Sequence, residues 1–155
     1  MHTSVEQKLS FWQQVGLILA LSTGLLLGQP VAADHGAIND FSEQLNTIRR
    51  NHNLPLLKVN VALNNVAQEH ADDMYERGYF SHSNLSGQNS IDRLRAKNIS
   101  FQRAAENIAK GQKTNRSVLT AWMNSPGHRK NILNPKYLKF GIGMTNYNWV
   151  LDFTN

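Results

Sequence analysis

The stretch that most constrains the fold of this chain is Ala121 to Leu133, AWMNSPGHRKNIL. A tryptophan near the end of one helical segment leads through Ser-Pro-Gly into a second one. Pro126 suits the first position of a helix, because its missing N–H costs nothing there. We expect Ser125 to be the N-cap and to accept a hydrogen bond from a backbone N–H with no helical partner. The stretch therefore predicts a helix pair, with His128 in the first turn of the second helix.

A histidine in the first turn of a helix meets the positive end of the helix dipole, which favours the neutral imidazole. A neutral imidazole can accept a hydrogen bond, act as a base or bind a metal ion. Considered alone, the stretch is better explained as a capped helix that carries a solvated histidine. Other motifs of the chain are needed to choose between a functional and a merely solvated His128.

Two motifs upstream change the interpretation of this stretch. They are Phe80-Ser81-His82 and Glu106-Asn107-Ile108-Ala109, and W-x-x-S-P-G-H-R-x-N-I-L follows them. In this order the motifs resemble bacterial members of the CAP superfamily (cysteine-rich secretory proteins, antigen 5 and pathogenesis-related 1). The resemblance extends from about Leu45 to Phe153. It implies an α+β fold, a three-layer α-β-α sandwich with a small antiparallel sheet and a central cleft.

Length and composition limit the class of protein. The chain has 155 residues, enough for one domain, and its 41% hydrophobic and 17% charged residues are typical of a globular protein. Its formal charge of +5 is scattered without a run of five basic residues, so we expect no nucleic-acid partner and at most weak attraction to anionic surfaces. It has no cysteine, whereas many eukaryotic relatives of the family are disulfide-bonded, so the resemblance is to a bacterial type.

Residues 1–33 are predicted to be a signal peptide. Val15 to Leu27 is an apolar core of 13 residues, too short to span a bilayer comfortably and typical of an export signal. Val31-Ala32-Ala33 supplies small residues for cleavage before Asp34. We therefore expect a secreted or periplasmic protein with no membrane span in its mature form. The start of the leader carries little positive charge, which leaves an uncleaved anchor as the alternative.

A short linker is predicted over 34–40 and the CAP domain over 41–155. Apolar periodicity and capping residues predict four helices before the Ser-Pro-Gly turn, and alternation predicts a hairpin after it. The helices run from Phe41 to about Asn51, from Asn60 to Gly78, from Ile91 to Lys97 with Ser90 as cap, and from Arg116 to Met123 with Thr114 or Asn115 as cap; the strands are Tyr137 to Thr145 and Asn148 to Phe153.

Several single residues are expected to have structural roles. His70 lies within the apolar stripe of its helix, where a histidine is more often a satisfied core group than a ligand. Gly141 and Gly143 lie within a predicted strand and indicate a bulge or a close approach of neighbouring backbone. Other positions are expected to be buried, namely Leu56, Leu57, Ile99, Phe101, Val118, Leu119 and Trp122.

The resemblance also implies the candidate site. His82 and His128 match the two histidines of the family's cleft and Glu106 matches one of its two glutamates, while the position of the second glutamate is Ser125. A glutamate among small and apolar neighbours, as Glu106 is, is costly to bury unless it is paired or coordinated. Two imidazoles and a carboxylate are ligand types of catalytic zinc sites. With Ser125 in place of the fourth group, we expect weak, reversible binding of a divalent cation such as zinc, and a metal-free hydrogen-bonded network is the alternative.

The usual enzyme motifs are missing from the sequence. There is no cysteine nucleophile, no G-x-S-x-G, no H-E-x-x-H and no glycine-rich phosphate loop. One carboxylate in a motif disfavours a glycosidase that needs a pair. The sequence therefore leans against an enzyme and favours a binding module of the envelope or extracellular space, with a lipid, glycan or peptide ligand. The alternatives are a metal-dependent hydrolase, with Glu106 as base, His82 and His128 as ligands and His128 a further catalytic candidate, or a purely structural polar cleft.

Overall fold

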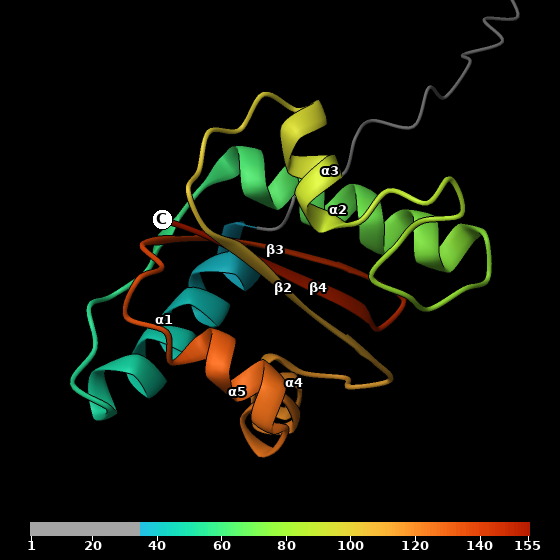
Figure 1. Cartoon of the computed structure of the whole chain (residues 1–155). Coiled ribbons are helices and arrows are strands. Elements are labelled where there is room, and N and C mark those ends of the chain that lie inside the picture. Colours follow the sequence, from blue (N-terminus) through green and yellow to red (C-terminus); the bar gives the residue numbers. More distant parts are fainter. Residues whose placement is uncertain (1–34) are drawn as a thin grey trace, which may run out of the picture. The chain divides into compact units, whose positions relative to one another are not determined.

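The computed structural model describes residues 35–155, and its centre is one four-stranded sheet in the order β1-β3-β4-β2 (Figure 1). The strands β3 and β4 form an antiparallel hairpin, and β2 pairs antiparallel with β4. The short strand β1 pairs parallel with β3, so the sheet predicted as antiparallel has one parallel pair at its edge. The bounds are Lys58–Val59 (β1), Ala104–Lys110 (β2), Lys139–Thr145 (β3) and Asn148–Thr154 (β4).

Helices cover both faces of this sheet, which confirms the three-layer α-β-α sandwich. Figure 1 shows α2 and α3 on one face and α1, α4 and α5 on the other. Within residues 35–155 no helix is both long enough and apolar enough to cross a membrane. The bounds are His35–Asn51 (α1), Val61–Glu76 (α2), Ser90–Ala96 (α3), Asn115–Asn124 (α4) and Pro126–Ile132 (α5).

The first helix is longer than predicted. It begins at His35, so residues 35–40, which were expected to be a linker, are helical. Its apolar stripe buries Phe41 and Leu45 as expected. The predicted signal peptide over 1–33 and its cleavage site lie outside the described residues, and both stay predictions.

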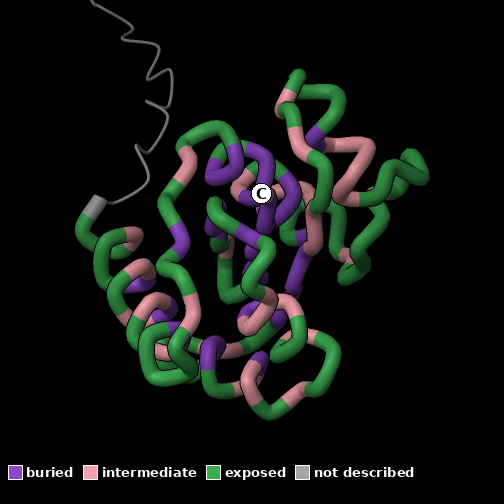
Figure 2. Tube along the Cα trace, turned by 60° about the vertical axis from the view of Figure 1, so that its left-hand side comes forward, coloured by how far each residue is buried: buried purple, intermediate pink, exposed green. Residues whose placement is uncertain are grey.

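The larger core lies between the sheet and the layer of α1, α4 and α5. Trp122 is 1% exposed, and its indole Nε1 donates to the carbonyl of Ile108 at 3.1 Å. Its ring meets Phe41 edge-on at 6.4 Å, and Phe41 in turn lies 6.0 Å from Phe140. Figure 2 shows buried positions concentrated along the strands in the middle of the molecule. Burial of aromatic rings therefore supplies much of the stability on this face.

The opposite layer approaches the sheet more closely, because two glycines of β3 leave room for it. A Cβ on Gly141 would lie 2.1 Å from the backbone carbon of Leu63, and one on Gly143 would lie 2.3 Å from the backbone nitrogen of Gln68. Real Cβ atoms do not come so close to backbone, so the α2 backbone can lie directly against β3 only at glycine. The predicted close approach is confirmed.

Beyond the short strand β1, side chains of α2 accept hydrogen bonds from backbone N–H groups at the edge of β3. The backbone N–H of Ile142 donates to Asn64 Oδ1 at 2.9 Å, and that of Met144 donates to Gln68 Oε1 at 3.1 Å. Two side-chain amides thus replace the missing neighbouring strand. Such covering protects a sheet edge against pairing with another chain.

The turns and caps agree with the sequence except at two positions. Asn146 and Tyr147 both have positive φ, the conformation that a two-residue hairpin turn requires, so the hairpin is confirmed. The cap of α3 is Asn89 and not Ser90, since Asn89 completes a reciprocal capping box with Asp92. Ser125 is at the N-cap position of α5, but its side chain makes no capping hydrogen bond.

Three predicted burials also need correction. Leu57 is buried at 3% exposed, whereas Leu56 is 49% exposed. Ile99 and Phe101 are only half-buried, packed against the small apolar cluster of Leu63, Val66 and Leu94.

Candidate functional site

The candidate site is built around Glu106 on β2, which is an edge strand of the sheet. The Glu106 side chain is only 2% exposed, and its Oε1 lies 2.7 Å from His82 Nδ1. His82 follows α2 in a loop and its side chain is 55% exposed. The structure therefore brings two of the predicted site residues into direct contact, although they are 24 residues apart in sequence.

Arg93 is the second partner of Glu106, and the sequence did not reveal this role. Its Nη2 lies 2.5 Å from Glu106 Oε2, and its Nη1 donates to the carbonyls of His82 at 2.9 Å and Gln88 at 3.0 Å. Its side chain is 10% exposed. The sequence indicated Arg93 only as one of the basic residues toward the end of a short helix. The signal that could have identified it is the need of a buried glutamate for a nearby cation.

His128 is joined to the site through Asn107, the neighbour of Glu106 on β2. Successive strand residues point to opposite faces, so Asn107 points toward the α5 layer. Its Nδ2 donates to the carbonyl of His128 at 3.1 Å, and its Oδ1 accepts from Asn131 Nδ2 at 2.8 Å. His82 and His128 thus come from opposite helical layers, and each is tied to β2.

The two histidines have pKa values that move in opposite directions. The hydrogen bond to Glu106 raises the pKa of His82, against burial and the charge of Arg93. Burial and then the charge of His82 lower the pKa of His128. The direction for His128 agrees with the neutral imidazole expected from the sequence, but burial and His82 cause it. The raised pKa favours the cationic form of His82, and the lowered pKa favours the neutral form of His128.

Asp152 lies directly across the sheet from Glu106, in register on β4. It is completely buried, and neither carboxylate oxygen has a hydrogen-bond partner among the described residues. Burial first, and then the charge of Glu106, raise the pKa of Asp152 well above its usual value, while Arg93 opposes the shift. Asp152 was not among the predicted site residues, because its burial and the facing glutamate depend on the register of β2 and β4.

His70 has the structural role predicted for it. It is buried, and its Nε2 donates to the carbonyl of Ser81 at 2.9 Å. Burial is the main cause that lowers its pKa. His70 on α2 therefore fixes the residue before His82, while Arg93 on α3 fixes His82 itself.

The donor set does not fit a zinc ion as it is arranged. In residues 35–155 no group of three or more histidine, aspartate or glutamate side chains is placed to hold a metal ion. Both oxygens of Glu106 already have partners, and one partner is a guanidinium that repels cations. Ser125, half-buried at the start of α5, offers a hydroxyl and no further charge. Zinc binding, expected from the residue types alone, stays a prediction.

The hollows in the described part of the chain include a larger and a smaller one. The larger, about 590 Å³, lies between α1 and α4, and its wall is mixed, with Ile48, Leu119 and Met123 beside polar residues such as Asp40 and Arg116. The smaller, about 220 Å³, lies between α2, α3 and the intervening loop, and its wall includes His70, Asp73, Asn84, Gln88 and Arg93. The smaller hollow shares Arg93 with the candidate site.

Comparison with known families gives one match that covers most of the chain. The model of the cysteine-rich secretory protein (CAP) family matches residues 43–153. The uncharacterized protein YkwD of Bacillus subtilis is 42% identical over 101 residues, 65% of this chain and 39% of that protein. The uncharacterized membrane protein YlbC of the same organism is 36% identical over 108 residues, 70% of this chain and 31% of that protein. The chain thus spans two fifths or less of these relatives.

Solved structures show the same fold. An extracellular protein containing a SCP domain from Bacillus anthracis is 36% identical, with a TM-score of 0.74 over 77% of this chain and 40% of that one. An outer surface protein of Borrelia burgdorferi is 25% identical, with a TM-score of 0.71 over 78% of this chain and 93% of that one.

Proposed function

Because this chain belongs to the cysteine-rich secretory protein (CAP) family, we propose that it is a binding module of the cell envelope or extracellular space. Binding is favoured over hydrolysis because both carboxylate oxygens of Glu106 already have partners. One oxygen bonds to His82 and the other to Arg93. The location is supported by the predicted signal peptide and by relatives described as extracellular or as an outer surface protein.

A general base needs a free lone pair within reach of the proton that it removes. Glu106 has a side chain 2% exposed, and its lone pairs face His82 and Arg93. The residue that the alternative hydrolase would use as base is therefore poorly placed for that role. While Nδ1 of His82 binds Glu106, its Nε2 and the partly exposed imidazole of His128 can hydrogen-bond a ligand without chemical change.

The ligand is a lipid, a glycan or a peptide, and each class would use the surface differently. Polar groups of a glycan or peptide suit the two histidines at the edge of β2, one a donor and the other an acceptor. An acyl chain suits the hollow between α1 and α4, where Ile48, Leu119 and Met123 supply apolar wall.

Native mass spectrometry of the exported protein tests the proposal, with two variants that separate these surfaces. We expect a retained ligand whose mass identifies its class. Loss of the ligand in His128→Ala would assign it to the histidine edge, and loss in Thr120→Trp, which fills the hollow between α1 and α4, would assign it there. Turnover of an envelope or peptide substrate that disappears in a folded His128→Ala variant would instead support the hydrolase.

A further inference from the structure

We propose that Arg93 is the resident cation of the Glu106 site, where it neutralises the buried carboxylate and holds the loop that carries His82, so that the site needs no metal ion. This proposal goes beyond the binding function and does not depend on which ligand is bound. It rests on three observations: the charge of the cluster, the geometry of the guanidinium and the construction of α3.

The charge argument starts from Glu106. A buried carboxylate needs a counter-charge, because removing it from water is expensive. His82 is 55% exposed, and an imidazole, unlike a guanidinium, is not a permanent charge. A guanidinium is a permanent charge, and that of Arg93 is 10% exposed and 2.5 Å from the carboxylate. The permanent counter-charge of the site is therefore Arg93.

The geometry assigns Arg93 a second task. Its Nη1 donates to the carbonyls of His82 and Gln88, and its Nη2 binds Glu106 on the sheet. Between these anchors the loop is closed by Asn84, whose N–H donates to the Gln88 carbonyl at 3.0 Å and whose Oδ1 accepts from the Gln88 N–H at 2.9 Å. Arg93 thus binds the closed loop at two carbonyls and β2 at one carboxylate. A guanidinium presents its donors in a fixed planar fork, whereas a lysine ammonium would have to reach all three acceptors from a single nitrogen.

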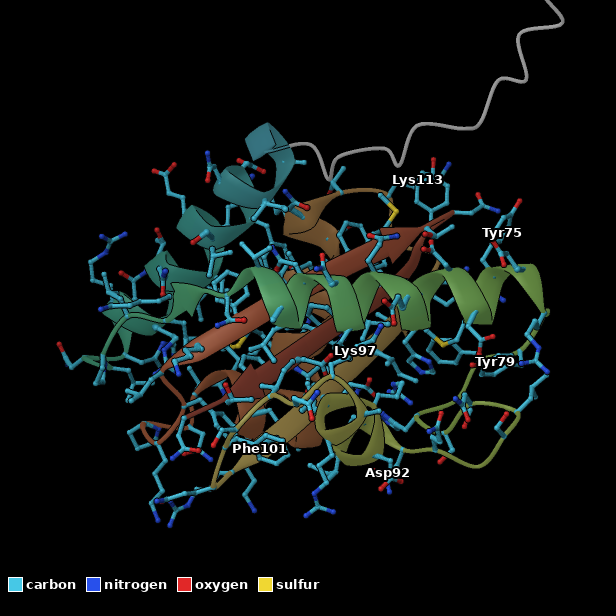
Figure 3. The ribbon with its side chains drawn as sticks, turned by 90° about the horizontal axis from the view of Figure 1, so that it is seen from above. Tyr75, Tyr79, Asp92, Lys97, Phe101 and Lys113 are labelled. Atoms are coloured by element: carbon cyan, nitrogen blue, oxygen red, sulfur yellow. The ribbon has the colours of Figure 1, made fainter. Side chains whose placement is uncertain are left out.

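The short helix α3 is constructed to place this side chain. Asn89 and Asp92 form a reciprocal capping box at its start, and Leu94, the residue after Arg93, is completely buried. Figure 3 shows α3, with Asp92 and Lys97, alongside α2 and the loop that begins near Tyr79. Fixed at both sides of Arg93, the helix has little freedom to turn the guanidinium away from Glu106.

A metal ion would have to compete with this arrangement. It would meet a cation 2.5 Å from the carboxylate that should bind it, and both carboxylate oxygens are engaged. The zinc affinity expected from two histidines and a glutamate should therefore appear only when the charge of Arg93 is removed.

Calorimetric titration of the purified full chain with Zn²⁺ at neutral pH tests the charge. We expect no saturable binding by the unaltered protein in the micromolar range, and at least tenfold tighter binding by Arg93→Gln. Arg93→Lys should stay unresponsive because it keeps the charge. The matched control is Arg95→Gln on the exposed side of the same helix, which loses the same charge and should not gain affinity.

Amide hydrogen exchange tests the positioning role. The amides of Gly87 and Gln88, both bonded to Asn84, should exchange at least tenfold faster in Arg93→Gln and in Arg93→Lys, and at the unaltered rate in Arg95→Gln. Stoichiometric zinc binding by the unaltered protein as tight as by Arg93→Gln would overturn the proposal. Unchanged exchange in Arg93→Lys would overturn it as well, and this variant keeps the test decisive if Arg93→Gln does not fold.

Discussion

The two faces of the sheet differ in what they bury. The face under α1, α4 and α5 is packed with rings, whereas the face under α2 and α3 has small apolar residues beside a group of ionisable ones. On the first face lie Phe41, Trp122, Phe140, Trp149 and Phe153; on the second lie Ala67, Ala71, Met74, Ile108 and Val150, beside Glu106, Asp152, Arg93 and His70. The comparison indicates that one face mainly stabilises the fold, while the other holds charge that apolar packing alone would not tolerate.

Strand β2 connects the two environments, since its side chains alternate between them. Glu106 and Ile108 point to the α2 and α3 layer, and Asn107 and Ala109 to the layer of α1, α4 and α5. Because β2 is an edge strand, residues from both layers can reach it, and the candidate site lies there. The following predictions test whether the two faces really differ in this way.

The largest effect is expected from the aromatic face. Trp122→Ala should lower the free energy of unfolding by about 3–5 kcal/mol, because it leaves a cavity and removes the hydrogen bond to the carbonyl of Ile108. Chemical denaturation measures the change. The control is Tyr75→Ala at the exposed end of α2, where the change should stay within about 0.5 kcal/mol. Equal losses in the two variants would contradict the assignment of the core to this face.

The opposite face should be sensitive to added volume. Gly143→Ala places a Cβ 2.3 Å from the backbone of Gln68, and backbone cannot move aside as a flexible side chain can. We expect a loss of about 3 kcal/mol, at the upper end of the usual range for overpacking. Gly127→Ala in α5 is the control, because open space surrounds that position. A thermal midpoint unchanged in Gly143→Ala would show that α2 does not lie so close to β3.

The sequence predicted the main helices and the hairpin better than the start of α1 and the short strand β1. Apolar stripes identified the helices, and alternation identified the hairpin of β3 and β4. The start of α1 was placed too late, because within residues 35–40 Ile38 alone extends the apolar stripe and the first turn carries no acidic residue. The strand β1 has two residues, too few for any periodicity to show.

The sequence predicted only part of the candidate site, again because some of its residues show no local sequence pattern. The motifs identified His82 and Glu106, which the structure places in contact, and His128, which Asn107 links to the same strand. Arg93 was missed because its partner lies 13 residues away on a strand that the sequence did not reveal. The zinc expectation followed from the family resemblance and the residue types, and neither shows that a guanidinium already holds the carboxylate.

Replacing Asp152 should have a smaller effect on stability, and it should stabilise the protein, whereas the two preceding substitutions destabilise it. Its raised pKa means that the folded state favours the protonated form, so its contribution to stability falls as pH rises from about 4 through the folded pKa. Asp152→Asn should therefore stabilise the protein near neutral pH, by about 1 kcal/mol, and lose this advantage near pH 4. Thermal unfolding across this range measures it, with the exposed Glu76→Gln as control. Destabilisation at neutral pH would show that the Asp152 carboxylate has partners that stabilise its charge.

The smallest effect on the free energy of unfolding is expected at the two histidines. Its sign as pH falls should differ between them. The raised pKa of His82 means that its pair with Glu106 contributes fully below about pH 6.5 and loses this contribution as pH rises through the folded pKa. The lowered pKa of His128 has the opposite consequence, since the folded state resists protonation and is penalised as pH falls through the ordinary histidine range. Each effect should be about 0.5 kcal/mol or less, because both rings are partly exposed and water screens their charges.

Denaturant titrations of His82→Ala and His128→Ala between pH 8 and pH 5 therefore test the comparison most finely. Relative to the unaltered protein, His82→Ala should become less stable as pH falls, whereas His128→Ala should become more stable. Because both substitutions remove the same side chain, differences in the unfolded state largely cancel between them. Parallel curves for the two variants would mean that Glu106 does not distinguish one histidine from the other. The charged face would then be organised by Arg93 and Glu106 alone, with both imidazoles responding only to solvent.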